Sequence, residues 1–260
     1  MKKKNLFIMI KKTILITGSC GRIGSSIANQ LFKKKIYNLI LVDSDKNKIK
    51  IQKKKFNNNS VNFLTINLNS KKNIDLLFLK SLKICKKIDT VIHCAYPKSK
   101  GWGTRFEHVK EKFLKEDLFN HLGITILFCQ NILKHFLKFK NGNLILISSI
   151  QGIQAPKFEH YRGLNMSSPI EYSAIKSGII SISKYLAKYY KKNNIRINCI
   201  SPGGIEDNQP KKFKARYKSS CNSKGLLSGH DVANAVLFLI SKESQFINGQ
   251  NIVVDDGWLL

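Results

Sequence analysis

The sequence predicts an α/β protein: a single doubly wound domain in which a parallel seven-stranded sheet carries helices on both faces. Short apolar runs alternate with longer amphipathic segments along the chain, and this alternation produces βαβ units and hence a parallel sheet. The 260 residues, 43% of them hydrophobic, suffice to bury a sizeable core. We therefore expect a basic N-terminal tail over residues 1–12 and one dinucleotide-binding and catalytic domain over residues 13–260.

The elements follow from the hydrophobic pattern in chain order. Strands are expected in the short apolar runs, at residues 13–17, 39–42, 61–66, 90–94, 143–148, 196–200 and 251–254. Helices are expected in the amphipathic segments between them, near residues 22–34, 45–55, 71–86, 105–138, 170–191 and 229–241. Residues 150–170 and 201–227 remain as long irregular stretches, which in a compact domain usually carry function.

The formal charge of +29 does not by itself indicate nucleic-acid binding. The lysines occur as pairs and triplets along the whole chain, for example at 33–35, 53–55 and 211–212. No single basic helix or aromatic-interleaved stripe gathers them, so we interpret them as solvated surface and as the composition of an AT-rich coding sequence. A nucleic-acid binder remains the alternative, which salt-dependent retention on DNA would test.

The cysteines and the N-terminal residues indicate the cellular compartment in which we expect the protein. The six cysteines form no C-x-x-C motif and no metal-type spacing with the six histidines, so we expect small core residues, a reducing cytoplasm and no metal. Residues 1–12 imitate a signal peptide, but their apolar run is too short and no cleavage site follows. No segment approaches transmembrane length, so no membrane partner is expected.

A glycine turn follows the first predicted strand, with Gly18, Gly21 and Gly24 opening a helix. Such glycines allow close backbone approach, and the helix N-terminus offers unpaired N–H groups to a pyrophosphate. Asp43 lies 19 positions after Gly24, the spacing of a carboxylate that binds the ribose 2′-hydroxyl. This is a Rossmann-type pattern that favours NAD, whereas Arg22 keeps NADP open as the alternative, because a guanidinium there could bind a phosphate.

Tyr172 and Lys176 are four positions apart in a predicted helix and therefore share one helical face. An ammonium beside a phenol favours the ionised phenol, which can then exchange a proton with an alcohol or ketone. Ser149, at the end of a predicted strand, and Asn120, in a helical segment, precede this pair in the chain.

These elements, together with Asn198-Cys-Ile-Ser-Pro-Gly203 and Asn248-Gly-Gln-Asn-Ile-Val-Val-Asp-Asp-Gly257, resemble the short-chain dehydrogenase/reductase family from about Thr13 to Trp258. The resemblance implies a catalytic tetrad of Asn120, Ser149, Tyr172 and Lys176. Tyr172 would exchange the proton and Ser149 would bind the substrate oxygen. Lys176 would hold the nicotinamide ribose and lower the pKa of Tyr172, and Asn120 would anchor a water.

The resemblance also implies a set of cofactor-binding residues. They are Gly18, Ser19, Cys20, Gly21, Arg22, Ile23, Gly24, Asp43, Asn67, Leu68, Cys94, Ala95, Tyr172, Lys176, Pro202, Gly203 and Ile205. The chain departs from the family at His93-Cys-Ala-Tyr96, where Asn-Asn-Ala-Gly is usual, and at Asn67-Leu68, where Asp-Leu is usual. Its T-G-x-x-G-x-x-G turn has the spacing of the sugar-nucleotide branch of the family. Fine cofactor contacts should therefore differ, whereas the chemistry should not.

The gap from Ser149 to Tyr172 is 23 residues, longer than the family commonly shows. The extra stretch, residues 157–169, mixes aromatic and polar groups, which suits a hydroxylated ring. The chain also resembles the flagellin-modification oxidoreductases of legionaminic-type acylneuraminate pathways. The segments that carry this resemblance are Ile150-Gln-Gly-Ile-Gln-Ala-Pro-Lys-Phe-Glu159, Asn165-Met-Ser167, Glu171-Tyr-Ser-Ala-Ile-Lys-Ser-Gly-Ile-Ile180, Cys94-Ala-Tyr-Pro97 and Gly203-Gly-Ile-Glu-Asp-Asn-Gln-Pro210. The resemblance implies a phosphorylated or nucleotide-linked amino sugar as substrate, and a homo-oligomer, dimer or tetramer.

The leading hypothesis is thus an NAD(P)-dependent oxidoreductase acting on a sugar-derived alcohol or ketone. A 3-oxoacyl carrier-protein reductase is a second hypothesis, because a basic surface would attract an acidic carrier protein. The long polar insertion argues against this hypothesis. A non-catalytic nucleotide-binding scaffold is a third, and the intact tetrad argues against that.

Overall fold

The computed structural model describes residues 11–260, so most of the expected basic tail lies outside the described residues. The seven strands form one parallel sheet in the order β3-β2-β1-β4-β5-β6-β7. They are β1 Lys12–Thr17, β2 Tyr37–Asp43, β3 Val61–Thr65, β4 Thr90–His93, β5 Gly142–Ile147, β6 Ile195–Pro202 and β7 Asn251–Val254. The predicted parallel seven-stranded sheet is confirmed, and every strand end lies within two residues of its expected position.

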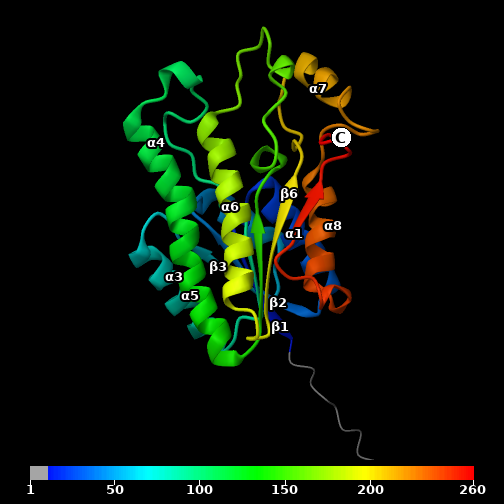
Figure 1. Ribbon diagram of the computed structural model, residues 1–260. Helices are drawn as coiled ribbons and strands as arrows, with labels where there is room; N and C mark the ends of the chain where they lie inside the picture. The colour runs from blue at the N-terminus through cyan, green and yellow to red at the C-terminus, as the bar shows by residue number, and fades with distance from the viewer. Residues whose placement is uncertain (1–10) are drawn as a thin grey trace, which may run out of the picture.

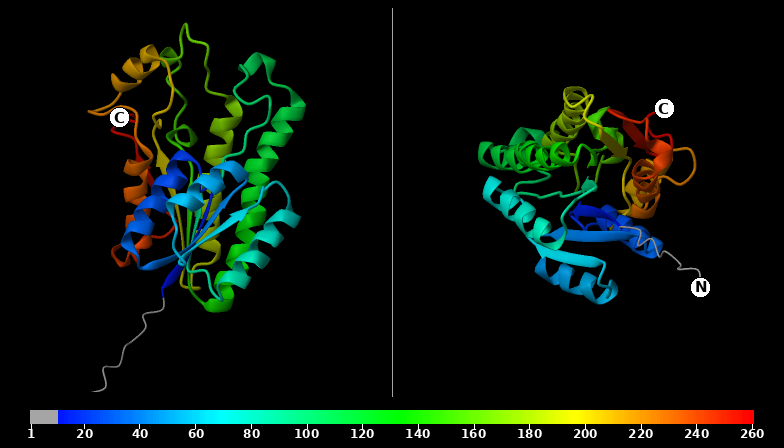
Figure 2. Two further views of the ribbon diagram at one scale, coloured as in Figure 1. Left: turned by 180° about the vertical axis from the view of Figure 1, so that it is seen from behind. Right: turned by 90° about the horizontal axis from the view of Figure 1, so that it is seen from below.

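Helices cover both faces of the sheet, as Figures 1 and 2 show. They are α1 Arg22–Lys34, α2 Lys46–Lys55, α3 Lys71–Ile84, α4 Glu111–Leu118, α5 Ile124–Phe139, α6 Ile170–Tyr189, α7 Lys211–Lys218 and α8 Gly229–Ile240. Helices α3, α5 and α6 pack on one face with Leu15, and α1 and α8 pack on the other with Ile14 and Ile16. Because successive strand residues point to opposite faces, strands β1 to β6 contribute to both cores. The doubly wound fold is confirmed.

The helix predicted over residues 105–138 is wrong at its start. A loop with a short 3₁₀ turn, Phe106–His108, precedes α4, and a π-helical turn, Phe119–Gly123, separates α4 from α5. Phe106 and Val109 have the spacing of one helical face. The Phe106 side chain is 72% exposed, however, so burial against a core does not stabilise a helix there. The apolar stripe there does not face a core.

The stretch 201–227 is not wholly irregular, because it contains α7. Five of the eight residues of α7 are basic, so its apolar face consists of Phe213 and Tyr217 alone, four positions apart. Both are buried in a small third core with Trp258. Two apolar residues are too few to show the helical periodicity of hydrophobic positions in the sequence. Helix α7 and the 3₁₀ turn Phe158–His160 together cover the end of the domain where the site lies.

The strand order reverses between β1 and β4, and ligands of open α/β sheets bind at such a switch point, beyond the carboxyl ends of the strands. The register places Thr17 of β1 beside His93 of β4, and Ile147 of β5 beside Ile200 of β6. The residues predicted for the site follow these strand ends. The fold therefore brings segments from most of the chain to one edge, the upper end in Figure 1.

Candidate active site

The glycine turn leaves no room for a side chain at Gly18 or Gly24. Gly18 has φ +63°, and a Cβ there would lie 2.6 Å from the carbonyl oxygen of Cys94 on the neighbouring strand end. A Cβ on Gly24 would overlap the Gly18 carbonyl. The turn thus closes against both β4 and its own helix, and the first N–H groups of α1, which have no partner inside the helix, face outward. This cradle suits a pyrophosphate.

Asp43, the last residue of β2, lies directly against that turn. Its Oδ2 accepts a hydrogen bond from the Cys20 amide at 2.9 Å, and its Oδ1 accepts one from the Asp45 amide at 3.1 Å. These two bonds fix the carboxylate in position. Each oxygen retains a lone pair for a ribose hydroxyl, which fits the predicted role.

Arg22, the first residue of α1, forms an ion pair with Asp207 of the loop that follows β6. The guanidinium is therefore directed across the cleft, toward the other side of the cofactor region. Sequence spacing cannot show this pairing, because the two residues are far apart in the chain and meet only where the loop after β6 reaches the start of α1. The pair weakens the case for Arg22 as a receptor of a 2′-phosphate.

A cleft of about 790 Å³ runs from the glycine turn to Tyr172. All the predicted cofactor-binding residues line it except Ser19. Ser19 is fully buried beneath the turn, where its hydroxyl donates to Gln52 Oε1 at 3.2 Å and Gln52 Nε2 donates to the Ser19 carbonyl at 2.6 Å. Gln52 thus supports the turn from α2, a role that its lysine-rich surroundings in the sequence did not reveal.

Tyr172, Lys176 and Ser149 meet at the inner end of the cleft. The Lys176 Nζ lies 5.6 Å from the centroid of the Tyr172 ring and donates to the Ile147 carbonyl at 3.1 Å. Ser148 donates to the Lys176 carbonyl at 2.6 Å, which ties the end of β5 to α6. The strand end and the helix that carry the three side chains are therefore held at a fixed separation.

Burial sets the pKa values of this group. It raises the pKa of the Tyr172 phenol above its ordinary value, and a hydrogen bond with Ser149 acts in the opposite direction. It also lowers the pKa of Lys176 to about 8. The pairing of Tyr172 with Lys176 predicts a lowered tyrosine pKa, and the structure differs because the loss of solvation of the phenolate outweighs its neighbours.

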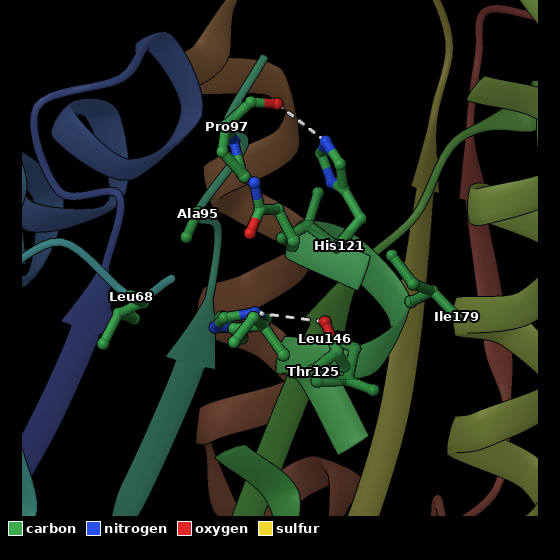
Figure 3. A pocket seen from close by; sticks show the side chains of 11 residues that line it. Leu68, Ala95, Pro97, His121, Thr125, Leu146 and Ile179 are labelled. Carbon is green, nitrogen blue, oxygen red and sulfur yellow. Dashed lines mark hydrogen bonds between the residues drawn. The ribbon is translucent and has the colours of Figure 1, made fainter. Parts of the chain in front are cut away.

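Asn120 does not line the main cleft. It lies in the π-helical turn and lines a separate small cavity of about 10 Å³, the size of one water molecule, which Figure 3 shows. Ile147, whose carbonyl accepts from Lys176, lines the same cavity. Extra residues of the π type in helices often mark functional positions, but no feature of the sequence predicted this one.

His93 lies at the wall of that cavity, where the family usually has asparagine. Its Nδ1 is 2.8 Å from Thr17 Oγ1 and its Nε2 is 3.3 Å from Thr125 Oγ1. Burial, together with the positive charge of Lys176, lowers the pKa of His93 to about 3, so the ring is neutral. A neutral ring with both nitrogens satisfied is a structural bridge between β1, β4 and α5.

An aromatic wall, formed by Tyr96 and Trp102, stands beside Tyr172. The Tyr96 ring centroid is 5.8 Å and the Trp102 centroid 6.0 Å from that of Tyr172, both in edge-on geometry. Buried Asp117 of α4 holds this loop by accepting from the amide and the hydroxyl of Ser99. Trp102 was not predicted from the sequence, although a tryptophan between two glycines in the loop that follows β4 was an available signal.

The insertion, residues 157–169, covers the outer end of the cleft. Its residues on the cleft wall are His160, Tyr161, Met166, Ser167, Ser168 and Pro169. His160 Nε2 lies 2.9 Å from Ser220 Oγ, and Arg216 of α7 donates to the Arg162 carbonyl at 2.6 Å. The insertion is thus held by α7 and its flanking loop.

Two kinds of feature, a membrane-spanning helix and a cluster of metal ligands, are absent from residues 11–260. No helix there is long and apolar enough to cross a membrane. Nor do three or more histidine, cysteine, aspartate or glutamate side chains of this part gather in a way that could hold a metal ion.

Comparisons with known proteins agree with this architecture. A family model described as "Enoyl-(Acyl carrier protein) reductase" matches residues 21–259. The chain is 38% identical over 251 residues to "Post-translational flagellin modification protein A" of Campylobacter coli, covering 95% of this chain and 98% of the relative. It is 29% identical to a 3-oxoacyl-[acyl-carrier-protein] reductase of Buchnera aphidicola, covering 95% and 97%.

Solved structures show the same fold. A short chain dehydrogenase from Leptospira borgpetersenii with bound NAD+ superposes with a TM-score of 0.86 at 28% identity, over 96% of this chain and 93% of that one. A 4-hydroxyisoleucine dehydrogenase complexed with NADH superposes with a TM-score of 0.82 at 25% identity, over 95% and 98%. The chain belongs to the short-chain dehydrogenase/reductase family. It is an NAD(P)-dependent oxidoreductase.

Proposed function

We propose that this enzyme transfers a hydride between NAD and a sugar-derived alcohol or ketone, in the biosynthesis of a legionaminic-type amino sugar for flagellin or another bacterial surface glycan. The observation that carries the proposal is the meeting of Tyr172, Ser149 and Lys176 at the inner end of a cleft whose outer wall is aromatic and polar. The flagellin-modification protein at 38% identity supports the pathway.

Side chains of this protein transfer the proton that leaves or joins the substrate oxygen. Bound NAD supplies the hydride acceptor, and its reduced form supplies the donor. In the oxidation direction Tyr172 Oη takes the hydroxyl proton of the substrate as its carbon loses a hydride; in reduction Tyr172 returns that proton to the carbonyl oxygen. Ser149 donates a hydrogen bond to the same oxygen and so places it against the phenol.

Lys176 and Asn120 support Tyr172 in this scheme. One proton of the Lys176 ammonium is used by the Ile147 carbonyl, which leaves two donors for ribose hydroxyls. Asn120 opens onto the water-sized cavity that Ile147 also lines. A water held there would connect Lys176 to solvent and renew the proton on Tyr172 between turnovers.

The substrate end of the cleft suits a sugar more than an acyl chain. Tyr96 and Trp102 can lie against the apolar face of a ring, as aromatic side chains do. Ser167 and Ser168, at the cleft wall, donate to the Gly103 carbonyl and to Gln151, so their hydroxyl oxygens can accept hydrogen bonds from hydroxyl groups of the ligand. An acyl chain has no hydroxyl groups to donate to these oxygens.

NAD is the preferred cofactor in this proposal. Asp43 is fixed by two backbone amides beneath the site of the adenosine ribose, where its charge would repel a 2′-phosphate. Arg22, the residue that would favour NADP, is engaged by Asp207.

We also propose that the enzyme works as a homo-oligomer, dimer or tetramer. Helix α6 exposes Tyr185 and Tyr189, 65% and 68% accessible and stacked on each other, on its outer face. Sedimentation velocity would decide, since a monomer at micromolar concentration would contradict it.

The experiment that tests the function is a substrate screen with a Tyr172→Phe variant. Amino sugars, their phosphates and their nucleotide-linked forms are incubated with NAD and NADH, and absorbance at the reduced nicotinamide band is followed. Tyr172→Phe should bind NAD normally and lose about 100-fold or more in kcat, the scale of general acid–base catalysis. Turnover by Tyr172→Phe close to the unaltered rate would contradict the assignment.

A 3-oxoacyl carrier-protein reductase is the second candidate, because two relatives with that activity in their names match 95% of this chain at 29% and 28% identity. An assay with an acetoacetyl thioester separates the two. Efficient reduction of the thioester, with no turnover of any sugar, would favour the second candidate.

A further inference from the structure

Arginine is scarce in this chain. Only five of its 45 lysine and arginine residues are arginines, so lysine supplies nearly all of the surface charge. The planar guanidinium fork binds pairs of oxygen atoms, which a lysine ammonium does not. The places where the chain uses arginine therefore indicate where it needs to bind several oxygens at once.

Three of the five arginines bind oxygens of the protein itself. Arg196 donates to two backbone carbonyls beside the end of α8, and Arg216 donates to carbonyls of the insertion. Arg22 is paired with Asp207. The side chains of Arg105 and Arg162, in contrast, have neither an ion pair nor a hydrogen bond to any residue between 11 and 260.

Arg105 and Arg162 line one and the same hollow, which we call the arginine pocket. Its volume is about 460 Å³. Its lining consists of Arg105, Phe158, Tyr161, Arg162, Gly163, Leu164, Asn165, Met166 and Ser167. Tyr161, Met166 and Ser167 also line the catalytic cleft, so the two spaces adjoin.

The two arginines come from segments far apart in the sequence that are tied together. Arg105 belongs to the loop between β4 and α4, and Arg162 belongs to the insertion. Ser167 of the insertion donates to the Gly103 carbonyl of that loop at 2.8 Å. The backbone of Arg162 is held by Arg216. The pocket is thus assembled by specific contacts between segments, and its two guanidinium groups are left for a ligand.

We propose that the arginine pocket binds a phosphate or diphosphate group of the substrate while the reacting ring occupies the adjoining cleft. This rests on the proposed function, because it assigns the anionic part of the same substrate. Two guanidinium groups match the oxygens of a phosphate through charge-assisted, paired hydrogen bonds. The Asn165 amide adds a neutral donor.

Phe158 bears on the source of that phosphate. Its side chain is 63% exposed at the pocket, where a large apolar ring gains little from water. A nucleobase could stack on it. A nucleotide-linked sugar would use Phe158 and the arginines together, whereas a sugar monophosphate would use the arginines alone.

The experiment is calorimetric binding to the enzyme saturated with NADH, so that the cofactor cleft is filled. The probes are inorganic pyrophosphate, glucosamine 6-phosphate and uridine diphosphate. The variants are Arg105→Ala, Arg162→Ala, Arg162→Lys, Phe158→Ala and the double variant in which both arginines are replaced by alanine. Lys112→Ala, which removes an exposed charge of the neighbouring helix outside the pocket, is the matched control. NADH affinity and the circular dichroism spectrum verify that each variant is folded.

Each arginine-to-alanine change should weaken pyrophosphate binding about tenfold, and the double change should abolish it. Arg162→Lys should recover part of the loss, and Lys112→Ala should bind normally. Tighter binding of uridine diphosphate that Phe158→Ala weakens would identify a nucleotide-linked substrate. Preference for glucosamine 6-phosphate, unaffected by Phe158→Ala, would identify a monophosphate.

Equal binding of pyrophosphate by the double variant and the control, or none by the unaltered enzyme, would overturn the proposal. The outcome is separable from that of the proposed function. Arginine-dependent binding without turnover of any sugar would uphold the pocket and contradict the function. Turnover of a sugar phosphate with an unchanged KM in the double variant would uphold the proposed function and contradict the role of the arginine pocket.

Discussion

Replacing Lys176 by methionine should stabilise the fold at neutral pH while it removes activity. Lys176 is 5% exposed, and burial lowers its pKa from 10.5 to about 8. A difference of that size corresponds to about 3 kcal/mol between the charged and neutral forms. Methionine has a similar length and no charge, and it adapts to irregular packing.

The direction of the expected change in the free energy of unfolding, and its dependence on pH, follow from the pKa of Lys176 in the two states. Because the pKa of Lys176 is lower in the folded than in the unfolded state, the unfolded chain binds the proton more tightly. The folded protein therefore bears the full cost of the buried charge below pH 8. That cost shrinks as the pH rises toward 10.5 and is absent above it. Methionine also loses the hydrogen bond to the Ile147 carbonyl, worth about 1 kcal/mol. The expected net gain near pH 7 is about 2 kcal/mol.

Urea titrations of the two proteins at pH 7 and pH 10, followed by circular dichroism, measure this difference. Lys184→Met, at an exposed position of the same helix, is the matched control and should change the free energy of unfolding little. A Lys176→Met variant that is less stable than the unaltered protein at pH 7 would refute the reasoning. A gain of equal size at both pH values would refute it as well.

The remaining predictions concern the cofactor and the insertion. The unaltered enzyme should have a higher kcat/KM with NAD than with NADP, and Asp43→Asn should reduce that preference about tenfold or more by removing a charge near the 2′-phosphate. Asp207→Asn should release Arg22 and strengthen NADP binding a few-fold, the modest scale of exposed ion pairs, with little change for NAD. Replacing residues 157–169 by a few glycines and serines should raise the KM for the sugar strongly and leave the Kd for NAD unchanged.

These three predictions have their own controls. Glu206→Gln removes a neighbouring ion pair, with Lys214, and should leave the cofactor preference unaltered. An enzyme that prefers NADP before any change would show that Arg22 outweighs Asp43. A shortened insertion that keeps its KM, in a protein whose melting temperature shows intact folding, would mean that the insertion has no part in binding.

Local chemistry accounts for what the sequence predicted well. Strand–helix alternation defines the doubly wound sheet because each unit must bury apolar residues on both faces. The glycine turn and the pairing of Tyr172 with Lys176 are short-range patterns, so spacing alone places them. Asp43 is found by the same logic, since the end of β2 lies beside the end of β1 in this fold.

The features that sequence reasoning missed depend on long-range packing. The contact of Trp102 with Tyr172 is set by the course of the β4–α4 loop, which Asp117 fixes from another helix. The pairing of Arg22 with Asp207 depends on how the loop after β6 crosses the cleft. The raised pKa of Tyr172 follows from burial, which a pattern of neighbours along one helix does not reveal.

The aromatic wall has a practical consequence for measuring this enzyme. The chain has two tryptophans, and both, Trp102 and Trp258, line the catalytic cleft. Excitation of tryptophan alone therefore reports on the site and on no other part of the molecule. Reduced nicotinamide absorbs where indole emits, so its arrival should quench both residues by energy transfer. Replacing one tryptophan at a time by phenylalanine would then show which of the two positions responds to cofactor binding and which to substrate binding, with no label added.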